Sequence, residues 1–342
     1  MANARQEASK KILVLAHFFA RDGRWIDEFC RRQDFLFEKV PYPNDEESWH
    51  SRGNTTPVSE WIKHFKYARS ALRGKPDCVI ACFPQMALVA AGLLLVNRSS
   101  STRLIAWTFN LGSLPSGWKR YFSRAALRRV DRFVVHSRGE IANYADWLGL
   151  DQARFAFVPL QRGDIAATTS SPIPRPYIVS LGSANRDYGT LVKAVLGTGI
   201  KTVIVSKKSI VDQLPNHPDL IKLHGLSAEE CNSILHDAEI NVVPIASLQT
   251  AAGQVTFTTS MRMGVATIAT RCIGTIDYIQ NGETGILVSP GDSEELGNAI
   301  QDLWQNRVLR LRIASAGRDH ADKYFSDEAA GENLAKVLDG VF

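Results

Sequence analysis

Short apolar runs alternate with amphipathic stretches along almost the whole chain. The runs are rich in β-branched residues, and the stretches between them place apolar residues three and four positions apart. This alternation predicts an α/β fold with parallel sheets and helices on both faces of each sheet. We expect strands at 11–16, 35–40, 79–83, 103–109, 132–136, 177–181, 202–206, 220–224, 240–244, 266–270 and 286–288.

The alternation occurs twice, and the composition changes between the two halves. Residues 166–176 (AATTSSPIPRP) are small, hydroxyl-bearing or proline residues, which is typical of a linker. A chain of 342 residues is also too long for one ordinary core. We therefore expect an N-terminal Rossmann-like domain over 1–166, a linker over 167–176, a C-terminal Rossmann-like domain over 177–322 and a last helix over 323–342.

Composition narrows the class of protein only slightly. Hydrophobic residues make up 45% and charged residues 22%, which is ordinary for a globular protein. The net charge of +5 permits an anionic substrate or membrane surface without requiring nucleic acid. The first ten residues are polar, and the most apolar run, 86–96, is shorter than the roughly 20 residues of a membrane span. We expect a cytoplasmic protein.

Several catalytic motifs are missing from the sequence. It has no GxxxxGK[ST] phosphate loop, no GxGxxG after the first strand, no GxSxG and no CxxC. It also has no Asp-x-Asp, so a metal-chelating glycosyltransferase is disfavoured. We expect neither a cofactor nor a bound metal.

The most informative segment is 254–292, which combines a helix, a buried strand and a series of glycine turns. It resembles the donor-domain signature of family-4 glycosyltransferases, which are retaining enzymes of GT-B fold. The resemblance implies two Rossmann-like domains facing across a cleft, with the last helix crossing back to the first domain. It also implies a nucleotide-sugar donor on the second domain and an acceptor on the first. The matching residues are Met261, Gly264, Ile268, Ala269, Thr270, Gly274, Gly282, Gly285, Leu287, Val288, Pro290, Gly291 and Asp292.

The chain departs from this family at two acidic positions. In the family, one glutamate contacts the donor sugar and a second contacts the nucleotide ribose, and these fall at Ala251 and Thr259 here. A glycine and a glutamine precede the helix instead, and a helix N-terminus presents free N–H groups to an anion. The alternative is that these two residues only cap the helix. We expect donor contacts from Gly253, Gln254, Val255, Thr256 and Thr259.

A second candidate is the loop 182–187, which follows the first strand of the C-terminal half. The family usually places Gly-Arg here to neutralise the donor diphosphate, whereas this chain has Ser183 and carries Arg186 as the only cation in the loop. A guanidinium beside the departing diphosphate would stabilise the transition state, so we predict that Arg186 is catalytic. The alternative is an ion pair with Asp187. Further donor contacts are predicted at Gly182, Ser183, Asn185 and Lys207.

Weaker candidates lie elsewhere. The resemblance implies that the backbone of His224, Gly225 and Leu226 contacts the base, while Ser227 and Glu230 after them form a capping box. In the N-terminal half, His17 follows the first strand and is a catalytic candidate, with a structural role as the alternative. Asn110 stands where the family often carries a histidine and is a further catalytic candidate, able to bind hydroxyls but not to transfer protons.

Basic and aromatic residues gather in one predicted helix. Residues 117–132 interleave Trp118, Tyr121 and Phe122 with six cations, a pattern that fits a peripheral contact with an anionic membrane. A solvated helix face is the alternative. The six cations are Lys119, Arg120, Arg124, Arg128, Arg129 and Arg132.

These patterns lead to one main hypothesis and two rivals. We predict transfer of a sugar, with retention, from a nucleotide-diphosphate donor such as a UDP-sugar to a glycan or lipid-linked acceptor in cell-surface polysaccharide or glycolipid synthesis. The absent glutamates motivate the first rival, a non-catalytic partner subunit of the same fold. The second rival is a sugar-nucleotide epimerase, which would act on the donor without an acceptor.

Overall fold

The computed structural model describes residues 9–16, 23–42, 56–97, 99–112, 114, 116–163, 165 and 170–342. The chain forms two compact units. Unit 1 is Met1–Val158 together with Gly331–Phe342, and unit 2 is Pro159–Ala330. Unit 1 is therefore built from two segments that are far apart in the sequence.

Unit 1 contains a six-stranded parallel sheet in the order β2-β1-β3-β4-β5-β6. Its apolar strands are buried on both faces, as the continuous hydrophobic runs predict. The elements are β1 (Lys10–Leu15), η1 (Ile26–Phe29), β2 (Phe35–Val40), α1 (Val58–Leu72), β3 (Cys78–Cys82), α2 (Pro84–Val96), β4 (Arg103–Trp107), α3 (Gly117–Leu127), β5 (Arg132–Val135), α4 (Gly139–Leu148), η3 (Gln152–Arg154) and β6 (Phe155–Phe157).

Unit 2 contains a second six-stranded parallel sheet, in the order β12-β11-β10-β7-β8-β9. With β7 counted as its first strand, this is the Rossmann order, in which the strand sequence reverses between β7 and β10. The elements are β7 (Ile178–Leu181), α5 (Tyr188–Val195), β8 (Thr202–Val205), α6 (Lys208–Val211), β9 (Leu220–Leu223), α7 (Ala228–His236), β10 (Ile240–Val243), α8 (Gln254–Arg262), β11 (Ala266–Thr270), β12 (Ile286–Val288), α9 (Ser293–Gln305) and α10 (Arg307–Tyr324).

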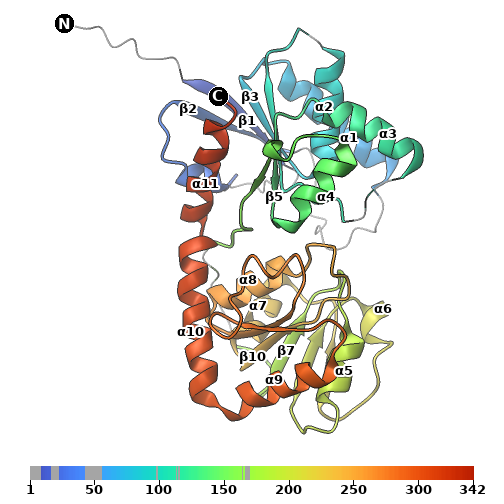
Figure 1. Ribbon diagram of the computed structural model, residues 1–342, viewed down its shortest axis with the longest axis vertical. Coiled ribbons are helices and arrows are strands. Elements are labelled where there is room, and N and C mark those ends of the chain that lie inside the picture. Colours follow the sequence, from blue (N-terminus) through green and yellow to red (C-terminus); the bar gives the residue numbers. More distant parts are fainter. Residues whose placement is uncertain are drawn as a thin grey trace, which may run out of the picture. The chain divides into compact units, whose positions relative to one another are not determined.

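Alternate residues of the unit 2 strands bury two separate layers of side chains. Ile178 and Ile204 pack with α5 and α9 on one face, whereas Val179 and Val203 pack with α7 on the other. Figure 1 shows these helices around the unit 2 sheet. The predicted α/β fold with two Rossmann-like domains is thus confirmed.

The last helix, α11 (Asp327–Asp339), begins in unit 2 and continues into unit 1. Gly331 lies so close to the backbone of Phe29 in η1 that no Cβ would fit between them. Leu334, Val337 and Leu338 of this helix are buried. The expected return of the last helix to the first domain is therefore confirmed.

Capping residues in the sequence indicate the first residue of two helices correctly and that of a third helix wrongly. Ser227 and Glu230 form the predicted capping box of α7, and Asp292 caps α9. A serine before an amphipathic stretch, here Ser137, favours a helix N-cap at that residue, but the N-cap of α4 is Arg138. The Ser137 carbonyl accepts from the N–H of Glu140 in a preceding turn, so the helix begins one residue later than expected.

Candidate active site

The strand order of unit 2 brings two predicted loops together. Ligands of open parallel sheets bind beyond the carboxyl ends of the strands where the order reverses, here between β7 and β10. The loop after β7 is tied to the loop after β10 by the Asp187 N–H, which donates to the Pro244 carbonyl over 3.1 Å. The N–H of Ser247 donates to Asn185 Oδ1, also over 3.1 Å. Asn185 Oδ1 therefore stabilises the loop after β10, and a donor contact from Asn185 stays a prediction.

Arg186 lies inside this pair of loops and donates only to neutral oxygens. Its Nε and Nη1 donate to the carbonyls of Leu181 (3.1 Å) and Ala184 (2.8 Å), and its Nη2 donates to Thr256 Oγ1 (3.0 Å). Burial lowers the pKa of Arg186 below its ordinary value, and the nearby Tyr188 and Cys272 side chains raise it by less. In the part of the chain that the structure describes, no ion pair involves Arg186.

The alternative ion pair between Arg186 and Asp187 is not formed. Asp187 instead caps α5, accepting from the Thr190 N–H (3.0 Å) and from the Thr190 hydroxyl (2.6 Å). A guanidinium in a fixed position without a carboxylate can accept an anionic ligand. This geometry supports the predicted role of Arg186.

Two glycines allow this arrangement. Gly182 has φ +111°, and a Cβ at this position would lie 2.7 Å from Arg186 Nη2. Gly253 is the N-cap of α8 with φ +83°, and its Cβ would lie 2.9 Å from Val243 Cγ1. Both positions therefore exclude larger residues, for backbone and for packing reasons.

The first turns of α8 carry the other predicted donor contacts. Gln254 is buried, and its Nε2 lies 3.4 Å from the Tyr278 hydroxyl, whereas Val255 is 51% exposed. Thr259 is buried and its Oγ1 accepts from Arg162 Nε over 2.9 Å. Ala251, at the other position where the family has glutamate, is buried as well.

The remaining residues predicted to contact the donor in unit 2 lie after different strands of the sheet. Ser183 Oγ accepts from the backbone N–H of Lys207 over 3.0 Å, so these two residues are neighbours beside the Arg186 loop. His224 and Gly225 are exposed after β9, the outermost strand. Among the described residues, no hydrogen bond joins His224, Gly225 or Leu226 to Arg186.

The two catalytic candidates of the N-terminal half are Asn110 and His17. Asn110 follows β4, and its Oδ1 accepts from the Gly112 N–H over 2.8 Å, so this oxygen stabilises the loop. His17 lies outside the described residues. Both roles stay predictions.

Sequence reasoning missed two buried titratable residues at the carboxyl end of β5. Glu140 accepts from the Tyr144 hydroxyl over 2.8 Å, and burial raises its pKa to about 7. His136 Nδ1 lies 2.7 Å from the Val158 carbonyl oxygen, and burial lowers its pKa to about 4, which keeps the ring neutral near neutral pH. Arg162 was missed as well, because its partner Thr259 is remote in the sequence and no local pattern marks the pair.

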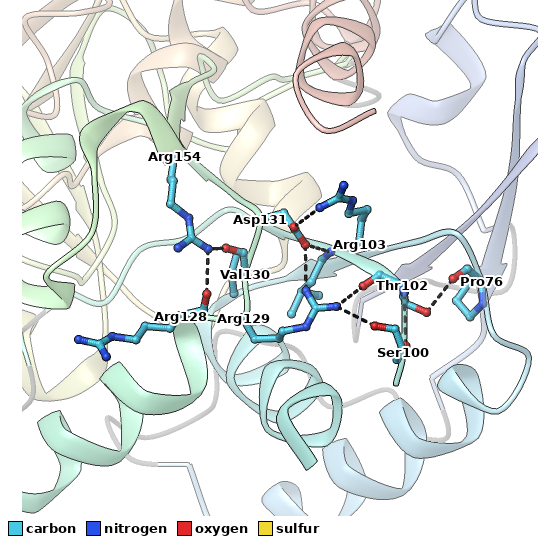
Figure 2. Close-up of polar contacts among 10 residues, drawn as sticks. Pro76, Ser100, Thr102, Arg103, Arg128, Arg129, Val130, Asp131 and Arg154 are labelled. Atoms are coloured by element: carbon cyan, nitrogen blue, oxygen red, sulfur yellow. Dashed lines mark hydrogen bonds and ion pairs between the residues drawn. The ribbon is translucent and has the colours of Figure 1, made fainter. Parts of the chain in front are cut away.

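The predicted basic segment is only partly a free surface. Asp131 accepts from Arg103 and Arg129, and Arg129 also donates to the Thr102 carbonyl over 2.7 Å (Figure 2). Arg124 donates to the Leu148 carbonyl, and Arg132 to that of Ala153. The prediction was therefore wrong to count all six cations as one surface. Those that stay exposed are Lys119, Arg120 and Arg128.

The residues that the structure describes include no cluster of three or more His, Cys, Asp or Glu side chains able to hold a metal ion. Within the same residues, none of the helices combines the length and the apolar character that crossing a membrane requires.

Comparison with known proteins finds relatives of this chain. Residues 186–306, which begin at Arg186, match the family model of "Glycosyl transferases group 1". The chain is 29% identical, over 80% of its length and 78% of the relative's, to the lipopolysaccharide core biosynthesis glycosyltransferase LpsE of Rhizobium meliloti (strain 1021).

Solved structures share the whole fold at low sequence identity. Sucrose-phosphate synthase from Thermosynechococcus elongatus superposes with a TM-score of 0.70 at 15% identity, covering 97% of this chain and 98% of that one. Alr3699/HepE of Anabaena, in complex with UDP, gives a TM-score of 0.67 at 12% identity and covers 97% and 99%. Residues 186–306 thus match the group 1 glycosyltransferase family, and the whole chain shares the GT-B fold of these solved structures.

Proposed function

We propose that the chain transfers a sugar from a UDP-linked donor, with retention, to a glycan or lipid-linked acceptor in cell-surface polysaccharide or glycolipid synthesis. The relative LpsE, named for lipopolysaccharide core biosynthesis, supports this class of acceptor. The solved complex of Anabaena Alr3699/HepE with UDP supports the choice of nucleotide.

The observation that carries the proposal is the environment of Arg186. Its guanidinium is held by two carbonyls and a hydroxyl at the start of α8, with no carboxylate bonded to it among the described residues. Negative charge builds up on the diphosphate as the sugar leaves, and a preorganised guanidinium stabilises that charge without reorganising. Arg186 would therefore act mainly on the leaving group.

Calorimetric titration of UDP, GDP, ADP and TDP tests this proposal. We expect UDP to bind most tightly, and Arg186→Ala to weaken UDP binding by about tenfold to a hundredfold, since it removes a charge-assisted contact. Arg318→Ala is the matched control, because this arginine is 61% exposed on α10 and its one ion pair among the described residues is with Asp322, at 3.8 Å. Equal UDP affinity of the two variants and the parent would show that Arg186 does not contact the nucleotide.

We propose an anionic membrane surface as a second partner, through α3. Trp118, Tyr121 and Phe122 are 70%, 73% and 64% exposed, and their spacing places them on one side of the helix. The helix contains no acidic residue, and its cations Lys119 and Arg120 are exposed. Exposed aromatic rings beside cations are typical of helices that lie in a lipid headgroup layer.

Co-sedimentation with vesicles tests the membrane contact. The protein should pellet with vesicles containing anionic lipid and remain in solution with neutral vesicles, and added salt should weaken the binding. A triple replacement of Trp118, Tyr121 and Phe122 by serine should abolish pelleting, whereas Val308→Ser, at a site 80% exposed in unit 2, should not. Equal pelleting of both variants would show that α3 is not the contact.

A further inference from the structure

Arg162 and Thr259 form a second guanidinium–threonine pair on the same side of α8 as Arg186 and Thr256. Arg162 Nε donates to Thr259 Oγ1 over 2.9 Å, and Arg186 Nη2 donates to Thr256 Oγ1 over 3.0 Å. The two threonines are three positions apart in a helix, so their side chains are neighbours at roughly 5–6 Å between Cβ atoms. Two guanidinium groups from different loops thus reach adjacent positions on α8.

The charge of Arg162 is only weakly compensated. Burial is the largest influence on its pKa and lowers it, while the carboxylate of Asp327 raises it less. Asp327 lies against Gly163, and no ion pair within the described residues joins Asp327 to Arg162. Removing a cation from water without an anion bonded to it is unfavourable. An anion arriving beside Arg162 would supply the missing partner.

The free donors of Arg162 are its two terminal nitrogens. Of the Arg162 side-chain nitrogens, only Nε hydrogen-bonds to the described residues, and Nη1 and Nη2 are not among the fully buried atoms left without a partner. A guanidinium with two adjacent unused N–H groups suits the two oxygens of a phosphate or carboxylate. Val255, one turn before Thr259, is exposed on the same side and adds an apolar contact.

We infer that Arg162 forms a second anion subsite, which takes an anionic oxygen group of the donor other than the group that Arg186 takes. This inference rests on the proposed nucleotide-diphosphate donor. Two groups of such a donor have the required chemistry: the second phosphate of the diphosphate, or a carboxylate on the sugar. In both cases Arg162 contacts the donor directly, and Thr259 holds its Nε.

The test measures dissociation constants of UMP, UDP, UDP-glucose and UDP-glucuronate for the parent and for Arg162→Gln. If Arg162 holds the second phosphate, UDP binding weakens at least about tenfold and UMP binding changes less than about twofold. If it holds a sugar carboxylate, UDP and UDP-glucose are unaffected, and UDP-glucuronate alone weakens by about tenfold or more. Unchanged constants for all four compounds, or a uniform loss across them, would overturn the inference.

A second variant gives a readout that a purely structural role would not produce. Asp327→Asn removes a carboxylate that raises the pKa of Arg162, so it should strengthen binding of UDP or of UDP-glucuronate, whichever of the two the subsite takes. A gain of about threefold or more for either compound supports the subsite even if Arg162→Gln does not fold, and no gain for either in a folded Asp327→Asn protein argues against it.

Inorganic pyrophosphate separates failure of this inference from failure of the proposed function. If the parent binds no nucleotide, the proposed donor class is wrong. Weaker pyrophosphate binding by Arg162→Gln than by the parent would then still support an anion subsite. Equal pyrophosphate binding by the two proteins would overturn the subsite as well.

Discussion

Glu140 should make the stability of unit 1 depend on pH in the direction opposite to an ordinary ion-paired carboxylate. It lies in the first turn of α4 and is 2% exposed. Its Oε1 accepts from Tyr144, and its Oε2 is buried without a partner among the described residues. Burial raises its pKa from 4.5 to about 7, and the Tyr144 hydrogen bond lowers it by less.

The direction of this pH dependence follows from how many protons Glu140 binds in the folded and in the unfolded state. Below pH 4.5 the carboxyl is protonated whether the protein is folded or unfolded, and its burial carries no charge penalty. Between pH 4.5 and about 7 the folded state keeps a proton that the unfolded state has released, so stability falls as pH rises. Above about pH 7 both states are ionised and the loss is complete. At about 1.4 kcal/mol per pKa unit, the total approaches about 3 kcal/mol.

Glu140→Gln isolates this effect because the amide cannot ionise. Urea unfolding of the parent and the variant is followed by circular dichroism at pH 4.5 and at pH 8. The difference in unfolding free energy between variant and parent is then compared between the two pH values. A two-domain chain can unfold in more than one step. The free energy is therefore taken from the unfolding step whose midpoint shifts when Glu140 is replaced. We expect the variant to gain about 2–3 kcal/mol relative to the parent between the lower and the higher pH. An unchanged difference would refute the assigned burial of the charge.

The remaining predictions concern single contacts. Gly182→Ala should weaken UDP binding about tenfold by displacing Arg186, whereas Gly197→Ala, which has a similar backbone strain at φ +81° and open space around it, should not; calorimetry decides between them. Gly253→Ala should lower the unfolding free energy of unit 2 by about 2 kcal/mol, because the new methyl group would collide with Val243. An unchanged midpoint of urea unfolding would contradict this. Tyr144→Phe should cost about 1 kcal/mol in unit 1 and speed hydrogen exchange of the Leu111 N–H, which donates to the Tyr144 hydroxyl over 3.1 Å; unchanged exchange there would count against this contact.

The sequence predicted the parts of the fold that depend on neighbouring residues. Continuous apolar runs located the strands, because parallel strands are buried on both faces. Ser227 with Glu230 located a helix start, because a capping box needs only residues three positions apart. The carboxyl end of β7 led to the prediction of Arg186 as a site residue, because ligands of open parallel sheets bind beyond the carboxyl ends of the strands.

What the sequence could not show were contacts between distant segments. Arg162 reaches Thr259 across 97 positions, so neither residue carries a local sign of the pair. Glu140 looks like an ordinary acid in a first helical turn, and only its burial distinguishes it. Arg129 resembles the exposed cations of α3 in sequence, but Asp131 and two backbone carbonyls fix its position.

The discontinuity of unit 1 has a consequence during synthesis of the chain. Unit 2 is one continuous segment and can fold as soon as it leaves the ribosome, but unit 1 lacks α11 until all of unit 2 has been made. Until then Phe29 and Phe35 lack their contacts with the C-terminal segment, where Gly331 lies against the Phe29 backbone and the Phe342 ring lies 5.6 Å from that of Phe35. A nascent chain of this protein therefore exposes an apolar surface that chaperones can recognise, and it does so for as long as translation of unit 2 lasts.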